Sequence, residues 1–122
     1  QKQQMQKEFP EQSTEMMMAA TYGDLKTVKR LINTQVNIKD SKGNMALMYA
    51  CQSGRLEVIK FLIKYEDLKH RNKQGFSGVD LAFQARQAET CMFLEQYCLQ
   101  KGFLDLKPVV RTTAKEQSAA AK

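Results

Sequence analysis

Apolar residues between Gly43 and Ile63 recur at helical spacing in two short groups, and Gly54 separates the groups. The first group is Met45, Leu47, Met48, Ala50 and Cys51, and the second is Leu56, Val58, Ile59, Leu62 and Ile63. This pattern predicts a short helix, a tight turn and a second short helix. Because so short a pair cannot bury its own apolar faces, the pattern also predicts neighbouring copies stacked against it.

A similar pattern precedes this stretch. Ser13 or Thr14 can cap a helix of mostly apolar residues that Gly23 would end, and Asp24 can open a second helix. A polar connector follows over residues 33–42, where extended chain is expected to end in a turn at the next glycine. The first copy therefore predicts the same helix, turn and helix.

The pattern also follows the stretch, from Gly75 onward. Its last helix is expected over about Ala88 to Lys101, with Gly102 as the stop. The spacing of glycines agrees with three copies, because Gly23 and Gly54 lie 31 residues apart and Gly43 and Gly75 lie 32 apart. A period of about 33 residues, built as a turn and two helices, is the ankyrin length.

The chain resembles the ankyrin-repeat family over about Thr14 to Gly102. Residues 43–55 resemble the family segment Gly-x-Thr-Pro-Leu-His-x-Ala-Ala-x-x-Gly-His, and residues 56–63 resemble its continuation Leu-Glu-Val-Val-x-x-Leu-Leu. The copies before and after keep parts of the same motif in register. The resemblance implies an all-α fold, an ankyrin-repeat solenoid of about three helix-turn-helix repeats with short β-turn connectors.

Two departures from the family motif carry structural expectations. The Thr-Pro-Leu-His segment is replaced at residues 45–48 and 77–80, so the hydrogen bonds by which it usually holds the turns are expected to be missing. Packing of methionine side chains is expected to compensate for the lost stability. The glycine between helices is Arg86 in the third copy. The third copy is therefore expected to be a terminal cap.

Three segments are expected along the chain: a Gln/Lys-rich arm over residues 1–13, the repeat domain over 14–102 and a C-terminal extension over 103–122. The arm either lies on the first face of the domain or stays disordered. The apolar part of the extension either folds back over the last helix or serves as a strand-like peptide for a partner. Since the chain starts at Gln1, we expect it to be processed or cut from something longer.

Composition and charge narrow the expected partners and location of the protein. The chain has 122 residues and a net charge of +6, but no dense Lys/Arg tract, so a mildly basic solvated surface is expected and nucleic acid is expected as a partner only within an assembly. No apolar run reaches membrane-span length, and no signal peptide opens the chain. Three cysteines fit reduced thiols, so an intracellular protein, cytoplasmic or nuclear, is expected without membrane partners.

Candidate chemistry is sparse. His70 is expected to be a solvent-exposed connector residue, Cys91 and Cys98 are expected to pack in the core, and the pair Glu66 and Asp67 is expected at a solvated helix end. No phosphate loop, nucleophile elbow or metal-ligand pair is present. We therefore expect no catalytic, cofactor or metal site, no small-molecule substrate and no enzyme.

What remains is a surface that binds a partner. In stacked repeats the turns and first helices line the concave side, so the predicted contact residues are Tyr22, Lys39, Lys42, Asn44, Gln52, Ser53, Arg71, Lys73, Gln74 and Phe76. Tyr22 and Phe76 are the expected anchors, although Phe76 could instead tuck under its own turn. The basic residues of the set favour an acidic partner segment.

Two functions follow as hypotheses. The first is a scaffold or adaptor that binds another protein by its concave side without catalysis. The alternative is a structural subunit of a large protein or ribonucleoprotein assembly whose neighbours order both tails.

Overall fold

The computed structural model describes residues 11–103 and contains helices but no strand within that range. The helices are α2 (Glu15–Tyr22), α3 (Leu25–Gln35), α4 (Ala46–Ser53), α5 (Leu56–Leu62), α6 (Gly78–Gln84) and α7 (Ala88–Lys101). The expected all-α arrangement of three helix pairs is confirmed. The predictions for residues 1–10 and 104–122 lie outside the described residues.

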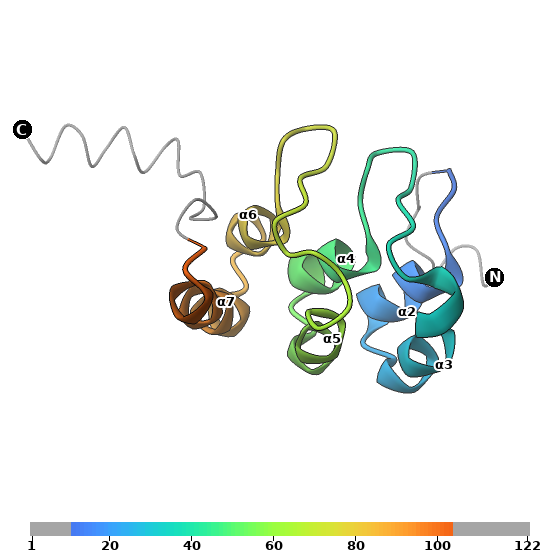
Figure 1. Cartoon of the computed structure of the whole chain (residues 1–122), viewed down its shortest axis with the longest axis horizontal. Coiled ribbons are helices and arrows are strands. Elements are labelled where there is room, and N and C mark those ends of the chain that lie inside the picture. Colours follow the sequence, from blue (N-terminus) through green and yellow to red (C-terminus); the bar gives the residue numbers. More distant parts are fainter. Residues whose placement is uncertain (1–10, 104–122) are drawn as a thin grey trace, which may run out of the picture.

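The helix pairs stack side by side in chain order (Figure 1). The first helices α2, α4 and α6 pack against one another in a row, and each also packs against the second helix of its own pair. The two connectors between pairs both project from the side of the first helices (Figure 1). This arrangement places the connectors next to each other on one side of the molecule.

Each first helix ends in a residue with left-handed backbone conformation. This residue is Gly23 in the first copy, Gly54 in the second and Arg86 in the third, with φ angles of 78°, 70° and 59°. A Cβ at Gly54 would also lie 2.5 Å from the Oε1 atom of Gln87, so a larger residue there would displace the side chain that donates to Gln52 O. In the third copy the arginine keeps the turn at the cost of a strained angle.

The copies are also linked by side chains that reach back one repeat. Arg55 Nε donates to the backbone oxygen of Thr21 at 2.9 Å, and Gln87 Nε2 donates to that of Gln52 at 2.9 Å. Both donors precede a second helix, and both acceptors lie near the end of the previous first helix. These repeated hydrogen bonds satisfy carbonyl groups that a helix leaves without a partner at its C-terminus.

Side-chain hydrogen bonds cap the first helices of the first and third copies, so the expectation that they are missing is wrong for residues 77–80. Thr14 Oγ1 accepts from Met17 N at 3.1 Å. In the third copy Ser77 and Asp80 form a reciprocal capping box. The second copy does lack this tie, because Met45 at the N-cap has no oxygen to accept a hydrogen bond.

A carboxylate from elsewhere caps the second copy instead. Glu66 is 3% exposed, and its Oε1 accepts from Leu47 N in the first turn of α4 at 2.8 Å. Its other oxygen accepts from Asn37 N at 2.9 Å. Gln35 makes the equivalent bond in the first copy, accepting from Met16 N at 2.9 Å. The expectation that Glu66 belongs to a solvated helix end is therefore wrong, whereas Asp67 is exposed.

The core runs through all three helix pairs. Its largest fully buried side chains include Met16, Met17, Met45, Leu47 and Ile59, which confirms that methionine fills much of the first-helix row. The thiols of Cys51 and Cys98 are buried and that of Cys91 is half-buried, as expected for packing roles. Burial raises the pKa of the Cys51 thiol, which keeps it protonated and unreactive.

None of the described helices combines the length and the hydropathy that a bilayer-crossing segment needs.

Candidate binding surface

Asp40 organises the first connector. Its Oδ1 accepts from the backbone N–H groups of Lys42 and Asn44, both at 2.9 Å. The Tyr49 hydroxyl donates to its other oxygen from α4. Burial, and then the hydrogen bond to Asp40, raise the pKa of Tyr49, so its hydroxyl remains a donor. The buried carboxylate thus holds the turn that presents the side chain of Lys42.

Asn72 has the same role in the second connector. Its Oδ1 accepts from the backbone N–H groups of Gln74 and Phe76, at 2.9 and 3.0 Å. Backbone hydrogen bonds close both turns as well, since Asp40 N donates to Asn44 O and Asn72 N donates to Phe76 O. Both turns are therefore fixed by the side chain that opens them.

The two connectors are also bonded to each other. Lys73 N donates to Lys42 O at 3.0 Å, and Asn72 Nδ2 donates to Asn44 Oδ1 at 2.9 Å. The ring Nε2 of His70 lies 2.8 Å from Gly43 O. His70 is therefore a half-buried link between connectors, and the expectation of a solvent-exposed histidine is wrong.

The predicted contact residues fall into two groups in the structure. Seven lie on or just after the connectors and define what we call the connector surface: Lys39, Lys42, Asn44, Arg71, Lys73, Gln74 and Phe76. Tyr22 ends α2, and Gln52 and Ser53 end α4. Because the connectors enter at the N-termini of the first helices, an eight-residue helix separates the two groups by about 12 Å.

Exposure differs among these residues. Lys39, Lys42, Lys73 and Gln74 are exposed on the connectors, and Tyr22 is 49% exposed on α2. Gln52 and Arg71 are exposed as well, whereas Asn44, Ser53 and Phe76 are half-buried. The expected full exposure of Phe76 is therefore not observed, which leaves Tyr22 as the exposed ring of the predicted pair.

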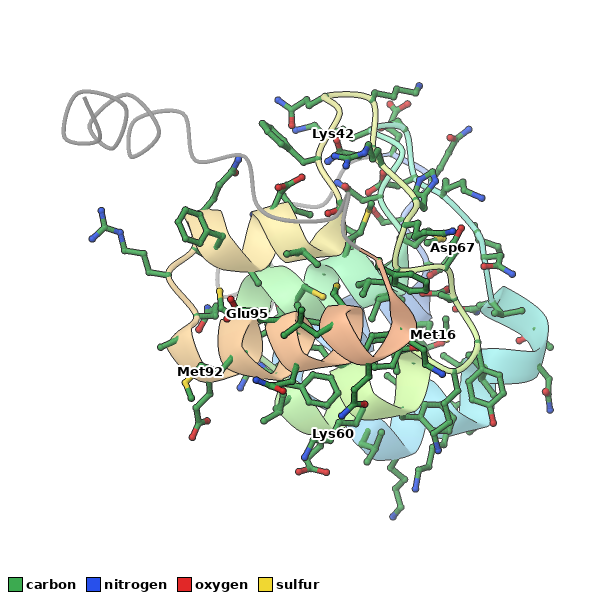
Figure 2. The ribbon with its side chains drawn as sticks, turned by 60° about the vertical axis from the view of Figure 1, so that its left-hand side comes forward. Met16, Lys42, Lys60, Asp67, Met92 and Glu95 are labelled. Atoms are coloured by element: carbon green, nitrogen blue, oxygen red, sulfur yellow. The ribbon has the colours of Figure 1, made fainter. Side chains whose placement is uncertain are left out.

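The charge of the connector surface comes mainly from its lysines. Arg71 Nη1 lies 3.3 Å from the buried Asp80 Oδ2 and donates to Gly75 O at 3.0 Å, so its charge is partly compensated. Lys39, Lys42 and Lys73 form no ion pair with another described residue. In Figure 2 the side chain of Lys42 lies at the connector edge of the molecule.

Sequence reasoning did not identify an apolar patch on α2. Met18 is 38% exposed and lies one helical turn before Tyr22, so the two side chains share one face. Because five apolar residues follow one another from residue 16 to 20, helical periodicity could not separate Met18 from its buried neighbours. On α6, Phe83 is exposed to the same extent, at 38%.

The described residues contain no group of three or more His, Cys, Asp or Glu side chains placed to hold a metal ion.

Comparisons with known proteins agree with the repeat architecture. The family described as ankyrin repeats (3 copies) matches residues 16–101. An ankyrin repeat protein of Rickettsia bellii is 30% identical over 95 residues, which cover 70% of this chain and 56% of that protein. Human ankyrin repeat and SOCS box protein 11 is 31% identical over 91 residues, covering 73% of this chain and 28% of that protein.

One solved structure is similar in fold and sequence. A chain of the complex of the Bd0816 predatory endopeptidase from Bdellovibrio bacteriovorus with immunity protein Bd3460 superposes with a TM-score of 0.63 at 30% identity. The match covers 69% of this chain and 46% of that chain. The present chain thus spans about half or less of the length of these relatives.

Proposed function

Because the chain belongs to the ankyrin-repeat family, we propose that it is a non-catalytic interaction module that binds another protein through the connector surface. Ankyrin repeats generally mediate protein–protein interaction, and the family is typically non-enzymatic. Among the solved structures with this fold is a chain of a complex between two proteins. A module of this kind acts as a scaffold or adaptor.

The proposal rests on the connectors, whose backbone is held by hydrogen bonds while their lysine side chains are exposed. Each turn is closed by its own Asp40 or Asn72 side chain, and the two turns are bonded to each other at 2.9 to 3.0 Å. The side chains of Lys39, Lys42 and Lys73 nevertheless extend into solvent. A preorganised backbone lowers the entropy cost of binding, so such a surface favours a stable complex.

The chemistry of the surface favours an acidic protein segment. The three lysines form no ion pair with a described carboxylate, although the charge of Lys39 acts on Glu66 and opposes the rise that burial causes in its pKa. Complementary charge accelerates encounter and selects the partner. The exposed side chains of Met18 and Tyr22 extend the contact along α2 and supply apolar area. A partner with acidic residues followed by an apolar side chain fits this arrangement.

The test compares two charge-reversal variants of equal size. Lys42→Glu/Lys73→Glu changes the connector surface. The control, Lys26→Glu/Lys64→Glu, changes one exposed lysine on α3 and one in the turn that follows α5. Each protein is immobilised in native extract, captured proteins are quantified by mass spectrometry, and circular dichroism checks the fold.

We expect the connector variant to lose proteins that the wild type and the control variant both retain. Tyr22→Ala should reduce their capture to a smaller extent, because the tyrosine lies about 12 Å along α2 from the connectors. Undiminished capture by a folded connector variant would contradict the proposal, as would equal losses in both charge-reversal variants.

A further inference from the structure

A second set of lysines lies on the outer helices, each against an aromatic ring. Lys29 Nζ of α3 is 5.8 Å from the centroid of the Phe61 ring on α5. Lys60 Nζ of α5 is 5.6 Å from the centroid of the Phe93 ring on α7. Each lysine thus reaches from its own repeat to the ring of the next, within the range of a cation–π interaction.

The set continues with Lys101 at the end of α7 and with Lys69 in the second connector. Lys101 Nζ is 5.6 Å from the centroid of the Tyr97 ring, and Lys69 Nζ is 5.0 Å from that of Phe103. The rings of Tyr97 and Phe103 meet edge to face at 6.2 Å between centroids. We call these residues the lysine–aromatic strip: Lys29, Lys60, Lys69, Lys101, Phe61, Phe93, Tyr97 and Phe103.

Most of the strip lies apart from the connector surface, whereas Lys69 belongs to the second connector, two residues before Arg71. Figure 2 shows Lys60 at the edge of the molecule opposite the edge that carries Lys42. The strip lysines on the helices, Lys29, Lys60 and Lys101, can therefore be tested separately from the connector lysines.

The four lysines of the strip carry positive charge and form no direct ion pair with another described residue. The exposed carboxylates Glu57 and Glu89 lie in the first turns of α5 and α7. Asp67 is the nearest acid in sequence to Lys69, and it accepts a hydrogen bond from the backbone N–H of that residue at 2.9 Å. An anion approaching the strip therefore meets four ammonium groups that form no salt bridge within the described residues.

The geometry selects among anionic partners. Bases of single-stranded nucleic acid need open aromatic faces for stacking. The four rings of the strip are half-buried and each lies against an ammonium group, while Tyr65, whose ring is tilted by 49° to that of Phe61, is the exposed ring beside them, with 49% of the residue exposed. A bilayer needs protruding apolar side chains to insert. The half-buried rings of the strip, covered by lysines, do not provide them. The exposed apolar side chains of α7, Met92 at 66% and Leu99 at 58%, share their helix face with the carboxylate of Glu95, which disfavours an anionic bilayer, so an acidic protein segment fits best.

The repeat sets a spacing for that segment. Lys29 and Lys60 occupy equivalent places in successive repeats, and packed helices lie about 8 to 10 Å apart. An extended peptide advances about 3.3 Å per residue, so every third side chain matches one repeat. We propose that the lysine–aromatic strip is a second docking surface, which binds an extended acidic segment with carboxylates at every third residue across the outer helices.

The proposal is tested with a fluorescein-labelled synthetic peptide that carries Glu at every third position and Ser or Gly between. Fluorescence anisotropy with the full chain gives the Kd at low and at physiological ionic strength. A first variant has Gln at all four lysines of the strip, a second has Arg there, and a third has Gln at Lys39, Lys42 and Lys73 of the connector surface. Thermal unfolding confirms that each variant is folded.

We expect the Gln variant of the strip to weaken peptide binding about tenfold or more, while the Arg variant and the connector variant stay near wild type. Binding should also weaken as salt shortens the Debye length from about 30 Å at 0.01 M to about 8 Å at 0.15 M. A peptide with the same number of Glu residues in one block should bind less tightly.

Three results would overturn the proposal: no binding of the spaced peptide at low salt, equal losses in the strip and connector variants, or tighter binding of a single-stranded oligouridylate or of anionic phosphatidylserine vesicles. Because the strip and connector variants are separate, failure here leaves the proposed function of the connector surface unaffected.

Discussion

Glu66 offers the sharpest test of how the repeats are held together. Replacing it with Ala removes both acceptors that its carboxylate provides, 2.8 Å from Leu47 N and 2.9 Å from Asn37 N. Leu47 N is buried in the first turn of α4, where Met45 supplies no side-chain cap. Leaving a buried N–H without a partner costs about 1 to 3 kcal/mol.

The loss at Asn37 should be smaller, because this residue is exposed and water can reach its N–H. Together the two losses give about 2 to 4 kcal/mol of unfolding free energy. For a domain of this size that corresponds to a decrease in Tm of about 10 to 25 °C.

Two control variants isolate the hydrogen bonds from other effects. Glu66→Gln keeps an acceptor for Leu47 N, as Gln35 does for Met16 N in the first copy, and it avoids burial of a charge. We expect this variant to lose about 1 kcal/mol or less. Asp67→Ala removes the neighbouring exposed carboxylate together with its solvent-accessible hydrogen bond from Lys69 N, and should cost about 1 kcal/mol or less.

Urea unfolding followed by circular dichroism measures these differences. If Glu66→Ala proved as stable as Asp67→Ala, the capping role would be refuted. A loss equal in Glu66→Gln and Glu66→Ala would show instead that charge, rather than acceptance of the hydrogen bonds, is what matters.

The pH dependence provides a second readout for the same residue. Burial raises the pKa of Glu66 above its ordinary value of 4.5, and the two backbone hydrogen bonds oppose this shift. A carboxyl with a raised pKa in the folded state contributes stability below the unfolded pKa, and this contribution is lost as pH rises through the folded pKa. The difference in stability between wild type and Glu66→Gln should therefore shift against the wild type as pH rises from about 4. A difference independent of pH would contradict the raised pKa.

The remaining predictions concern the inter-repeat turn and the thiols. Gly54→Ala should destabilise the protein more than Gly75→Ala in urea unfolding: both have positive φ, but a Cβ at Gly54 meets Gln87 Oε1 at 2.5 Å, whereas nothing lies within 4 Å at Gly75. We expect about 1 kcal/mol for the backbone strain alone at Gly75 and clearly more at Gly54; equal losses would contradict the packing argument. Cys51 is buried and its thiol has a raised pKa, so it should resist iodoacetamide until the protein unfolds, whereas the half-buried Cys91 should react first. Mass spectrometry of the native protein checks this order. Early modification of Cys51 would contradict it.

Much of the fold could be predicted from short-range sequence pattern. The starts at Thr14 and Asp24 and the stops at Gly23, Gly54 and Gly102 are observed as expected. Each depends on interactions within one helical turn, where residue type alone indicates capping or left-handed backbone.

The candidate site was less predictable. Exposure of the connector lysines is observed, but the half-burial of Phe76 and the partial exposure of Met18 depend on how neighbouring repeats pack. His70 was assigned to solvent because nothing near it in sequence is a partner; its partner, the Gly43 carbonyl, belongs to the preceding connector. The roles of all these residues in binding remain predictions.

The sequence by itself determined the repeat, its length and its helix boundaries, because these arise from local periodicity and capping that recur in each copy. Only the tertiary structure decided which side chains cross between elements distant in sequence. Glu66 reaches back to cap α4 at Leu47, and Lys29 reaches a ring on the next outer helix. Such contacts depend on the stacking of one copy against the next, which no single copy specifies.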